Sequence, residues 1–279
     1  MRLDQLVARA TERLAGSGSP SPRLDAEVLL CHVLERDRTW LYTWGDRNIE
    51  PWPRARFAAL LALRATGWPV AYLTGEREFW GLSLATSPAT LIPRPDTERL
   101  VEAALDKAAA DSGALLDLGT GSGAIALAFA SERPGWQVVG VDHAPGAVAL
   151  ARANAERLAI ANARFAESDW FAALGGQRFA LIVANPPYLA TDDPHLGQGD
   201  VRFEPHSALV AAASGLADLR WLIGQAREHL LPGGWLLLEH GIGQGQAVRA
   251  ALDVAGYRQV ATLVDLGGRE RVSLGCVDG

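Results

Sequence analysis

The residues best suited to chemistry follow an unbroken apolar run at 179–184: they are Asn185, Pro186, Pro187 and Tyr188. Such a run is typical of a strand that is buried on both faces of a parallel sheet. A proline lacks the amide hydrogen that a sheet ladder needs, so the strand ends here. The two prolines also hold the residues before them in extended conformations. We therefore predict a stiff loop at the carboxyl end of a strand, where open α/β sheets bind their ligands.

This loop offers two hydrogen-bond acceptors that suit an amino group. The side-chain carbonyl of Asn185 and the backbone carbonyl of Pro186 can together accept both hydrogens of a planar –NH2 group. Tyr188 adds an aromatic face on which a planar amide or base can lie. With both hydrogens held, the electron pair of the nitrogen is free to face an electrophile. The loop favours chemistry on an amino nitrogen, and the alternative is a proline-stiffened turn with a surface tyrosine.

A glycine-rich segment at 115–124, reading L-L-D-L-G-T-G-S-G-A, predicts a strand, a tight turn and the start of a helix. Glycines permit positive φ and let a ligand approach the backbone closely. Asp142 follows the next predicted strand, about twenty residues further on, where a carboxylate can accept hydrogen bonds from ribose hydroxyls. These features together indicate a nucleoside-containing cofactor.

The glycine segment alone leaves the identity of this cofactor open, because G-x-G-x-x-A is also a dinucleotide-binding pattern. Two features separate the candidates. Asp117 stands ahead of three alternating glycines, an arrangement that looks like the S-adenosylmethionine (SAM) loop of class I methyltransferases. The Asn185 loop prepares an amino nitrogen for alkylation and has no purpose in hydride transfer. Together they favour SAM.

Composition narrows the class of protein. The net charge is −6 and no basic run appears, which argues against broad nucleic-acid binding. Cys31 and Cys276 lie in apolar contexts at opposite ends of the chain and suggest neither a metal site nor a disulfide framework. No segment has the apolar length of a signal peptide or a membrane span. We expect a soluble cytoplasmic protein that has no membrane partner.

The elements that must position these residues follow in order along the chain. Residues 1–70 predict a small helical domain, because apolar residues recur at helical spacing and no strand pattern interrupts them. Residues 71–90 predict a hairpin linker. In 91–279, Asp96 is placed to cap a helix and Glu98 to lie in its first turn.

Beyond residue 112 strands and helices alternate, which is typical of a doubly wound sheet. We predict an α/β fold with a doubly wound, mostly parallel seven-stranded sheet, whose last two strands pair antiparallel. The strands are expected near 114–118, 137–141, 162–166, 180–184, 235–239, 257–263 and 271–277. The helices are expected near 123–132, 145–158, 217–230 and 244–255.

Several motifs extend the argument from a fold to a family. The Asn-Pro-Pro-Tyr loop after the fourth strand resembles that of methyltransferases acting on amino nitrogens of adenine, guanine or glutamine. Three further motifs are narrower: I-P-R-P-D-T-E at 92–98, V-R-F-E-P at 201–205 with Ala208-Leu209, and G-G-W-L-L-L-E-H-G at 233–241. In combination, and over nearly the whole chain, they resemble the release factor glutamine methyltransferases (PrmC/HemK type). The sister enzyme that acts on a large-subunit ribosomal protein carries a different sequence at 95–98, so we prefer the release-factor enzyme.

The resemblance implies a class I methyltransferase fold at 91–279 and a helical substrate-recognition domain at 1–70. It implies methyl transfer from SAM to the side-chain amide N5 of the glutamine in the Gly-Gly-Gln motif of class 1 peptide chain release factors. The implied SAM contacts are Gly119, Thr120, Gly121, Ser122, Gly123, Asp142, Trp170 and Asn185. The implied substrate-binding residues are Asn185, Pro186, Pro187 and Tyr188, and those assigned to catalysis are Asn185, Pro186 and Tyr188. The roles of Arg94, Asp96 and Glu204 stay open.

Two other classes of function remain as alternatives. One is an amino-nitrogen methyltransferase that acts on a ribosomal protein glutamine or on a nucleic-acid base. A base methyltransferase would use the same loop, but the acidic balance and the small helical domain argue against it. The other is a non-catalytic nucleotide-binding module, which binding of labelled SAM would test.

Overall fold

The computed structural model describes residues 1–279, and the chain forms two compact units in it. The first unit contains residues 1–76 together with a short segment, 194–203. The second contains residues 77–193 and 204–279. The first unit is therefore discontinuous in sequence, which no pattern in the chain had indicated.

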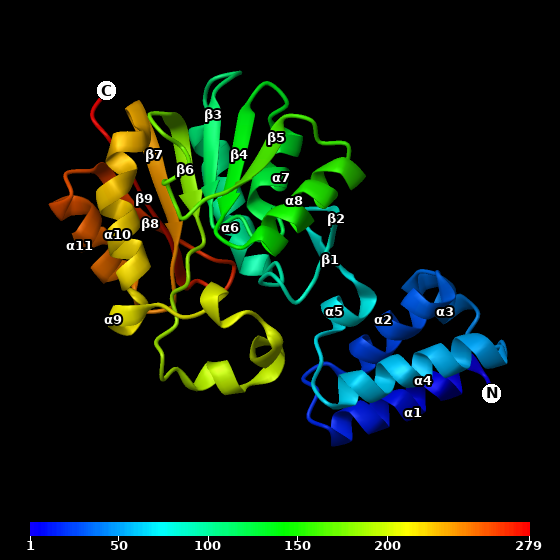
Figure 1. The fold of residues 1–279 in the computed structure, drawn as a ribbon. Helices are drawn as coiled ribbons and strands as arrows, with labels where there is room; N and C mark the ends of the chain where they lie inside the picture. Colours follow the sequence, from blue (N-terminus) through cyan, green and yellow to red (C-terminus); the bar gives the residue numbers. More distant parts are fainter. The chain divides into compact units, whose positions relative to one another are not determined.

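The first unit is helical, as the spacing of its apolar residues predicted. Its helices are α1 (Leu3–Gly16), α2 (Pro22–Leu34), α3 (Arg38–Thr43), α4 (Pro51–Ala65) and α5 (Val70–Thr74) (Figure 1). Prolines occupy the first position of α2 and α4, where a missing amide hydrogen costs nothing. The helices pack around a core in which Leu14, Leu29 and Phe57 are completely buried.

The segment 194–203 is held to this unit by one buried guanidinium and one ring contact. Arg64 of α4 is ion-paired through Nε with Asp25 Oδ2 at 2.7 Å and through Nη1 with Asp200 Oδ1 at 2.9 Å. The rings of Trp68 and Phe203 lie 5.4 Å apart between centroids. The Arg64 side chain is only 6% exposed, and the two carboxylates help to compensate the burial of its charge. The segment contains the 3-10 helices η2 (Pro194–Gly197) and η3 (Gly199–Phe203).

The predicted hairpin is present as β1 (Glu76–Phe79) and β2 (Leu82–Ala85). Trp80 and Gly81 join the two strands, and both have positive φ, as a two-residue hairpin turn of type I′ requires. Ala85 is fixed to the second unit because its amide donates to Asn154 Oδ1 at 2.7 Å and its carbonyl accepts from Asn154 Nδ2 at 3.1 Å.

The second unit is built on one seven-stranded sheet in the order β5-β4-β3-β6-β7-β9-β8. The strands are β3 (Ala114–Leu118), β4 (Gln137–Asp142), β5 (Ala163–Glu167), β6 (Phe179–Ala184), β7 (Leu230–Glu239), β8 (Arg258–Val264) and β9 (Glu270–Cys276). All neighbours pair parallel except β9, which lies antiparallel between β7 and β8. The predicted strands and the antiparallel final pair are confirmed, although β7 begins five residues earlier than 235.

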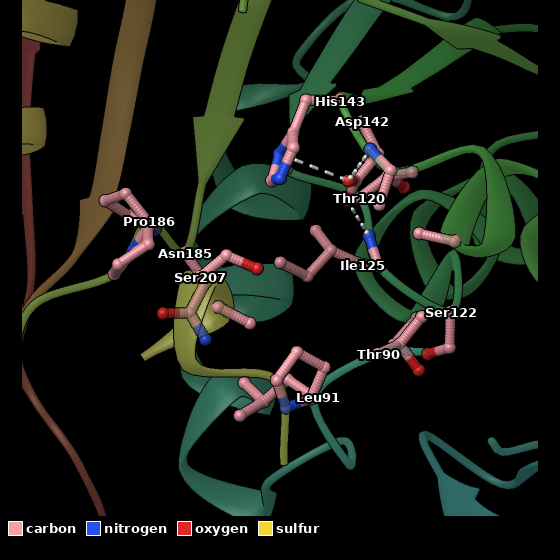
Figure 2. A pocket seen from close by; sticks show the side chains of 18 of the residues that line it. Thr90, Leu91, Thr120, Ser122, Ile125, Asp142, His143, Asn185, Pro186 and Ser207 are labelled. Atoms are coloured by element: carbon pink, nitrogen blue, oxygen red, sulfur yellow. Dashed lines mark hydrogen bonds and ion pairs between the residues drawn. The ribbon is translucent and has the colours of Figure 1, made fainter. Parts of the chain in front are cut away.

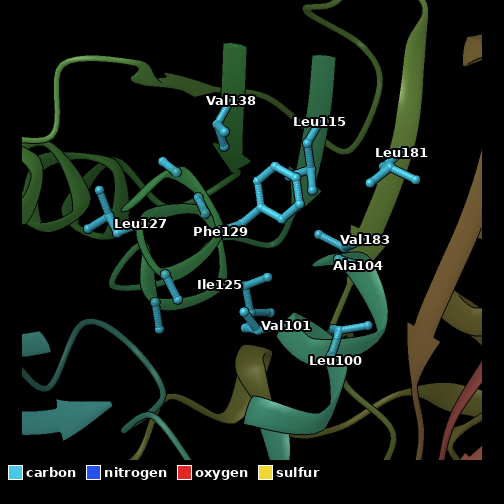
Figure 3. Close-up of a cluster of buried hydrophobic side chains, with 14 of the residues drawn as sticks. Leu100, Val101, Ala104, Leu115, Ile125, Leu127, Phe129, Val138, Leu181 and Val183 are labelled. Carbon is cyan, nitrogen blue, oxygen red and sulfur yellow. The ribbon is translucent and has the colours of Figure 1, made fainter. Parts of the chain in front are cut away.

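Helices cover both faces of this sheet (Figure 1). One face packs against α6 (Glu98–Lys107), α7 (Ala124–Glu132) and α8 (Pro145–Arg157), and in Figure 3 Phe129 of α7 faces Leu115 of β3. The other face packs against α10 (Ala217–Ala226) and α11 (Gly245–Val254). Successive residues of one strand, such as Leu115 and Leu116, enter opposite cores, since side chains alternate along a strand. This explains the unbroken apolar runs.

The remaining elements are short. They are η1 (Pro95–Thr97), η4 (His206–Ala208), α9 (Ala212–Gly215) and η5 (Arg227–His229). The prediction that Asp96 caps a helix is wrong: Thr97 precedes α6, and the carboxylate of Asp96 is instead ion-paired with Arg271 at 3.2 Å. Glu98 does lie in the first turn of α6. None of the helices combines the length and apolarity that crossing a membrane requires.

Candidate active site

A cavity of about 340 Å³ opens in the second unit at the carboxyl ends of its central parallel strands (Figure 2). Most of the residues predicted for the site line it: Gly119, Thr120, Gly121, Ser122, Asp142, Trp170, Asn185, Pro186 and Pro187. Two predicted residues, Gly123 and Tyr188, do not line it. The loops after β3, β4, β5 and β6 meet at one edge because the strands are parallel, and this brings together residues far apart in the sequence.

The loop after β3 presents bare backbone to the cavity. Gly119 and Gly121 have φ values of 70° and 57°, in the left-handed region that glycine tolerates best. The amide of Gly121 donates to Asp142 Oδ2 at 3.0 Å, and the amide of Ala144 donates to Asp142 Oδ1 at 2.9 Å. Asp142 therefore fixes the glycine loop to the end of β4 and still holds its carboxylate at the cavity wall, where lone pairs remain for a ligand.

The side chain of Asp117 holds the glycine loop in place by accepting hydrogen bonds. Its side chain is completely buried, and Oδ2 accepts from the Thr120 hydroxyl at 2.7 Å and from the Ala126 amide at 3.2 Å. Oδ1 has no hydrogen-bond partner, and burial raises the pKa of the carboxyl to about 7. The acidic residue ahead of the glycines thus supports the turn and does not face the cavity.

Trp170 forms part of the cavity wall next to the glycine loop. Its φ is 47°, and its carbonyl accepts from the Ser168 hydroxyl at 2.7 Å, so the turn after β5 directs the residue. A Cβ built on Gly119 would lie 3.6 Å from the indole ring, so a side chain there would narrow the space beside it.

The carboxyl of Asp218 also lines the cavity, and partial burial and the nearby Asp169 raise its pKa.

The Asn185 loop forms another wall, and Figure 2 shows Asn185 and Pro186 across the cavity from Thr120 and Asp142. Asn185 Nδ2 donates to Thr97 Oγ1 at 3.2 Å. No donor of the chain engages the side-chain oxygen of Asn185 or the carbonyl oxygen of Pro186. Both acceptors that the sequence singled out are therefore open to a ligand.

Tyr188 lies behind this wall. Its hydroxyl donates to Glu239 Oε1 at 3.4 Å, and its backbone carbonyl accepts from Gln244 Nε2 at 3.0 Å. Burial and the neighbouring Glu239 raise the pKa of its phenol. In this structure the tyrosine anchors the loop through its hydroxyl, and a direct contact of its ring with a substrate stays a prediction.

Glu239 lies beside the site without lining the cavity, and the sequence reasoning did not single it out. It ends β7, its side chain is buried, and burial raises the pKa of its carboxyl to about 7. Ala184 pairs with Leu238, so Glu239 stands next to Asn185 at the carboxyl end of the neighbouring strand. The signal in the sequence that could have identified Glu239 was a charged residue at the end of an apolar strand.

The segment 92–98 is fastened to the cavity by ion pairs. Glu204 is ion-paired with Arg94, which lines the cavity, and Glu204 Oε1 also accepts from the Ile92 amide at 2.9 Å. Asp96 is paired with Arg271 as described above. These contacts assign structural roles to three residues whose roles were open from the sequence.

The arrangement suits a nucleoside on one side and an amino group on the other. Backbone amides, the carboxylate of Asp142 and an indole line one part, and two unengaged carbonyl oxygens line the other. No histidine stands at the cavity as a general base except His143, whose Nδ1 lies 3.6 Å from Asp142. His240 is buried elsewhere, with Nε2 at 2.9 Å from Ser273 Oγ.

Comparison with known proteins gives matches over both units. Residues 5–75 match the family described as the PrmC N-terminal domain, and residues 96–199 match the methyltransferase small domain. The chain is 58% identical to the release factor glutamine methyltransferase of Vibrio cholerae, over 98% of this chain and 96% of that one. It is 56% identical to the enzyme of the same name from Escherichia coli, over 92% of this chain and 93% of that one.

Solved structures support the fold. A methyltransferase from Pyrococcus furiosus aligns with a TM-score of 0.55 at 19% identity, over 81% of this chain and 98% of that one. At this identity the likeness bears on the arrangement of helices and strands alone, and it agrees with the mostly parallel seven-stranded sheet described above.

Proposed function

Because the chain belongs to the release factor glutamine methyltransferases, we propose that it methylates the side-chain amide nitrogen of a glutamine in a class 1 peptide chain release factor. The chain is an enzyme, and its methyl donor is S-adenosylmethionine. The glutamine we propose is that of the Gly-Gly-Gln loop. One observation carries the proposal: two unengaged acceptors, the side-chain oxygen of Asn185 and the carbonyl of Pro186, stand in the same cavity as a glycine loop and a carboxylate.

The residues present fit SAM. The glycine loop leaves room along its backbone, since a Cβ built on Gly121 would meet no heavy atom nearer than 4.0 Å. We expect Asp142 to accept from the ribose hydroxyls and Trp170 to pack on the adenine. When bound, SAM supplies a methyl group on a sulfonium sulfur, which is a strong alkylating agent.

The chain must make a poor nucleophile react. An amide nitrogen shares its electron pair with the carbonyl, and the rotation barrier of about 18–20 kcal/mol indicates the scale of that delocalisation. Asn185 and Pro186 would each accept one hydrogen of the –NH2 group and so orient the remaining electron density toward the cofactor side of the cavity. Orientation of this kind can lower a barrier by at most about 7–11 kcal/mol.

The same two acceptors favour the transition state. Positive charge develops on the nitrogen as the new N–C bond forms, and oxygen acceptors fixed by the prolines stabilise that charge without reorganising. The methylated nitrogen then loses one of its two hydrogens as a proton. It is acidic enough at that point to need no strong base.

The test is to incubate the purified full chain with labelled SAM and, separately, a class 1 release factor, ribosomal RNA, DNA and ribosomal proteins. We expect label only in the release factor, and mass spectrometry should place one added methyl on the glutamine of the Gly-Gly-Gln loop. A release factor in which that glutamine is replaced by alanine is the matched control and should stay unlabelled. Label in RNA, or in the alanine factor, would contradict the proposal.

A further inference from the structure

The loop that carries Asn185 and Pro186 cannot be fixed through its middle. Pro186 and Pro187 have no amide hydrogen to donate, and no donor of the chain engages the carbonyl oxygen of Pro186. The direction of that carbonyl therefore depends on how the chain is held on either side of the two prolines. The sheet fixes the entry to the loop, because Ala184 is the last residue of β6. The exit from the loop needs an anchor of its own.

Gln244 is the anchor at the exit. Its Nε2 donates to the backbone carbonyl of Tyr188 at 3.0 Å and to that of Ser214 at 3.3 Å. Its Oε1 accepts from the amide of Gly241 at 2.8 Å. A backbone amide only donates and a backbone carbonyl only accepts, so a single orientation of the Gln244 side chain satisfies all three contacts. The direction of each hydrogen bond is therefore determined.

The backbone of Gln244 gives its side chain a rigid support. Gln244 directly precedes α11, and its carbonyl accepts from the amide of Val248 at 3.0 Å. Its own amide donates to the carbonyl of Gly241 at 3.1 Å, which closes the turn between β7 and α11. The side chain thus ties the exit of the loop to the end of the strand that neighbours β6.

The Tyr188 carbonyl is enclosed on a second side by Gly215. A Cβ built on Gly215 would lie 2.0 Å from that carbonyl oxygen, so the close approach requires a glycine. The two residues before it, Ala213 and Ser214, have φ values of 53° and 57°, which are uncommon for residues with a side chain. Such a turn persists only where its surroundings hold it. The bond from Gln244 to the Ser214 carbonyl is one of the contacts that do so.

We propose that Gln244 is a positioning residue, which holds the Tyr188 carbonyl and so keeps the acceptors of Asn185 and Pro186 directed at the substrate amide. The inference rests on the proposed function, because it explains what keeps these two acceptors in place during methyl transfer. Gln244 does not line the cavity, so it acts on the reaction through the loop and not by touching SAM or the glutamine.

The main test is Gln244→Glu in the full-length enzyme. This variant keeps the size and shape of the side chain and the acceptor for Gly241, but it places a carboxylate oxygen, which cannot donate, against two carbonyl oxygens. We expect kcat for methylation of the native release factor to fall about tenfold or more, since a misplacement of about 1 Å can cost about a hundredfold. SAM affinity, measured by calorimetry, should not change.

The rate is expressed per SAM-binding site, which separates positioning from a merely structural role. Unfolded molecules bind no SAM and are not counted, so a variant that only loses stability keeps the wild-type rate per site. A role in packing alone would also leave the rate unchanged, because glutamate has nearly the shape of glutamine.

Two further variants make the result specific. Gln246→Glu introduces the same charge at an exposed position of α11 and should behave as wild type. Gln244→Met keeps the length of the side chain and adds no charge, but it cannot donate to Tyr188, so kcat should fall in it as well. Gln244→Met thus separates the lost hydrogen bond from charge repulsion, and it decides the question if Gln244→Glu does not fold.

A wild-type rate per SAM-binding site in either folded variant of Gln244 overturns the inference. It is also overturned if Gln246→Glu loses as much rate as Gln244→Glu, or if SAM affinity falls as far as kcat, since Gln244 would then not act through the substrate loop. Failure of the proposed function looks different: the wild-type enzyme would bind SAM and leave the native release factor unmethylated.

Discussion

Glu204 is buried beneath Arg94 and ion-paired with it, and its Oε1 also accepts from the amide of Ile92 at 2.9 Å. The carboxylate of Glu204 thus links the segment 92–98, which forms part of the cavity wall, to a segment more than a hundred residues later in the chain. The pairing compensates a carboxylate that would otherwise be costly to bury.

We predict that Glu204→Ala lowers the free energy of unfolding by about 1.5–3 kcal/mol, the scale of hydrogen bonds to a charged group. Glu204→Gln can keep the bond from Ile92 but loses the charge, so it should cost less than the alanine variant. Urea denaturation of the three proteins measures the difference. Equal losses for both variants would mean that the ion pair with Arg94 contributes all of the stability.

Asn185→Ala should lower kcat by about a hundredfold or more, in line with the loss of one fixed group that stabilises transition-state charge. The side chain makes one hydrogen bond within the chain, to Thr97, so unfolding should change by less than about 1 kcal/mol. Single-turnover methylation and denaturation of the same preparation separate the two effects. An unchanged rate, with SAM bound, would show that other groups hold the nitrogen.

Asp142→Ala should weaken SAM binding by about 1.5–3 kcal/mol, because it removes a charged acceptor and also frees the amide of Gly121. Asp142→Asn keeps one acceptor oxygen and should lose less. Calorimetry with SAM measures both variants, and Asp106→Ala, which removes an exposed carboxylate from α6, is the control. Wild-type affinity in Asp142→Ala would place the ribose elsewhere.

Stability should depend on pH through Glu239. Burial raises its pKa to about 7 from 4.5 in the unfolded chain, so the folded state favours the protonated carboxyl. Its contribution is complete below about 4.5 and is lost as the pH rises toward 7. Other carboxyls, such as Asp265 with its lowered pKa, act in the opposite direction. The useful quantity is therefore the difference in unfolding free energy between Glu239→Gln and wild type.

We expect this difference to move in favour of Glu239→Gln as the pH rises, with a limiting slope of about 1.4 kcal/mol per pH unit. Denaturant titrations at several pH values between 4.5 and 7 measure it. A difference that stays flat across that range would mean that Glu239 titrates in the folded chain as it does in the unfolded one.

The helical unit offers an exposed aromatic surface for the proposed release factor. Trp52 is 71% exposed, and the Arg56 guanidinium lies 5.9 Å from its ring centroid. Exposed tryptophans are frequent binding hot spots, so Trp52→Ala should weaken binding of the whole factor by about 1 kcal/mol or more. Binding of a short Gly-Gly-Gln peptide should not change. Val254→Ala, at a still more exposed position of α11, is the control. Equal loss for factor and peptide would argue against a separate recognition surface.

The sheet could be predicted because strands that are buried on both faces appear in the sequence as apolar runs. The cavity could be predicted because its walls are loops that directly follow those strands. The ion pairs could not. Asp96 has the local sequence of a helix cap, but Arg271 offers its carboxylate a charged partner 175 residues away. Glu239 lies beside Asn185 because β6 pairs with β7, and no local pattern connects the two residues. The hydrogen bond from the Tyr188 hydroxyl to Glu239 also joins residues far apart in the sequence, so it could not be predicted either.

The membership of 194–203 in the helical unit limits how this protein can be exchanged in parts. The chain passes between the two units at 76, at 193 and again at 203. A chimera that took only residues 1–76 from a relative would pair a foreign Arg64 position with the native Asp200, and the buried guanidinium would depend on a residue from the other parent. Such a chimera should need 194–203 from the same parent as 1–76. The two stretches therefore have to be exchanged together, although more than a hundred residues separate them in the sequence.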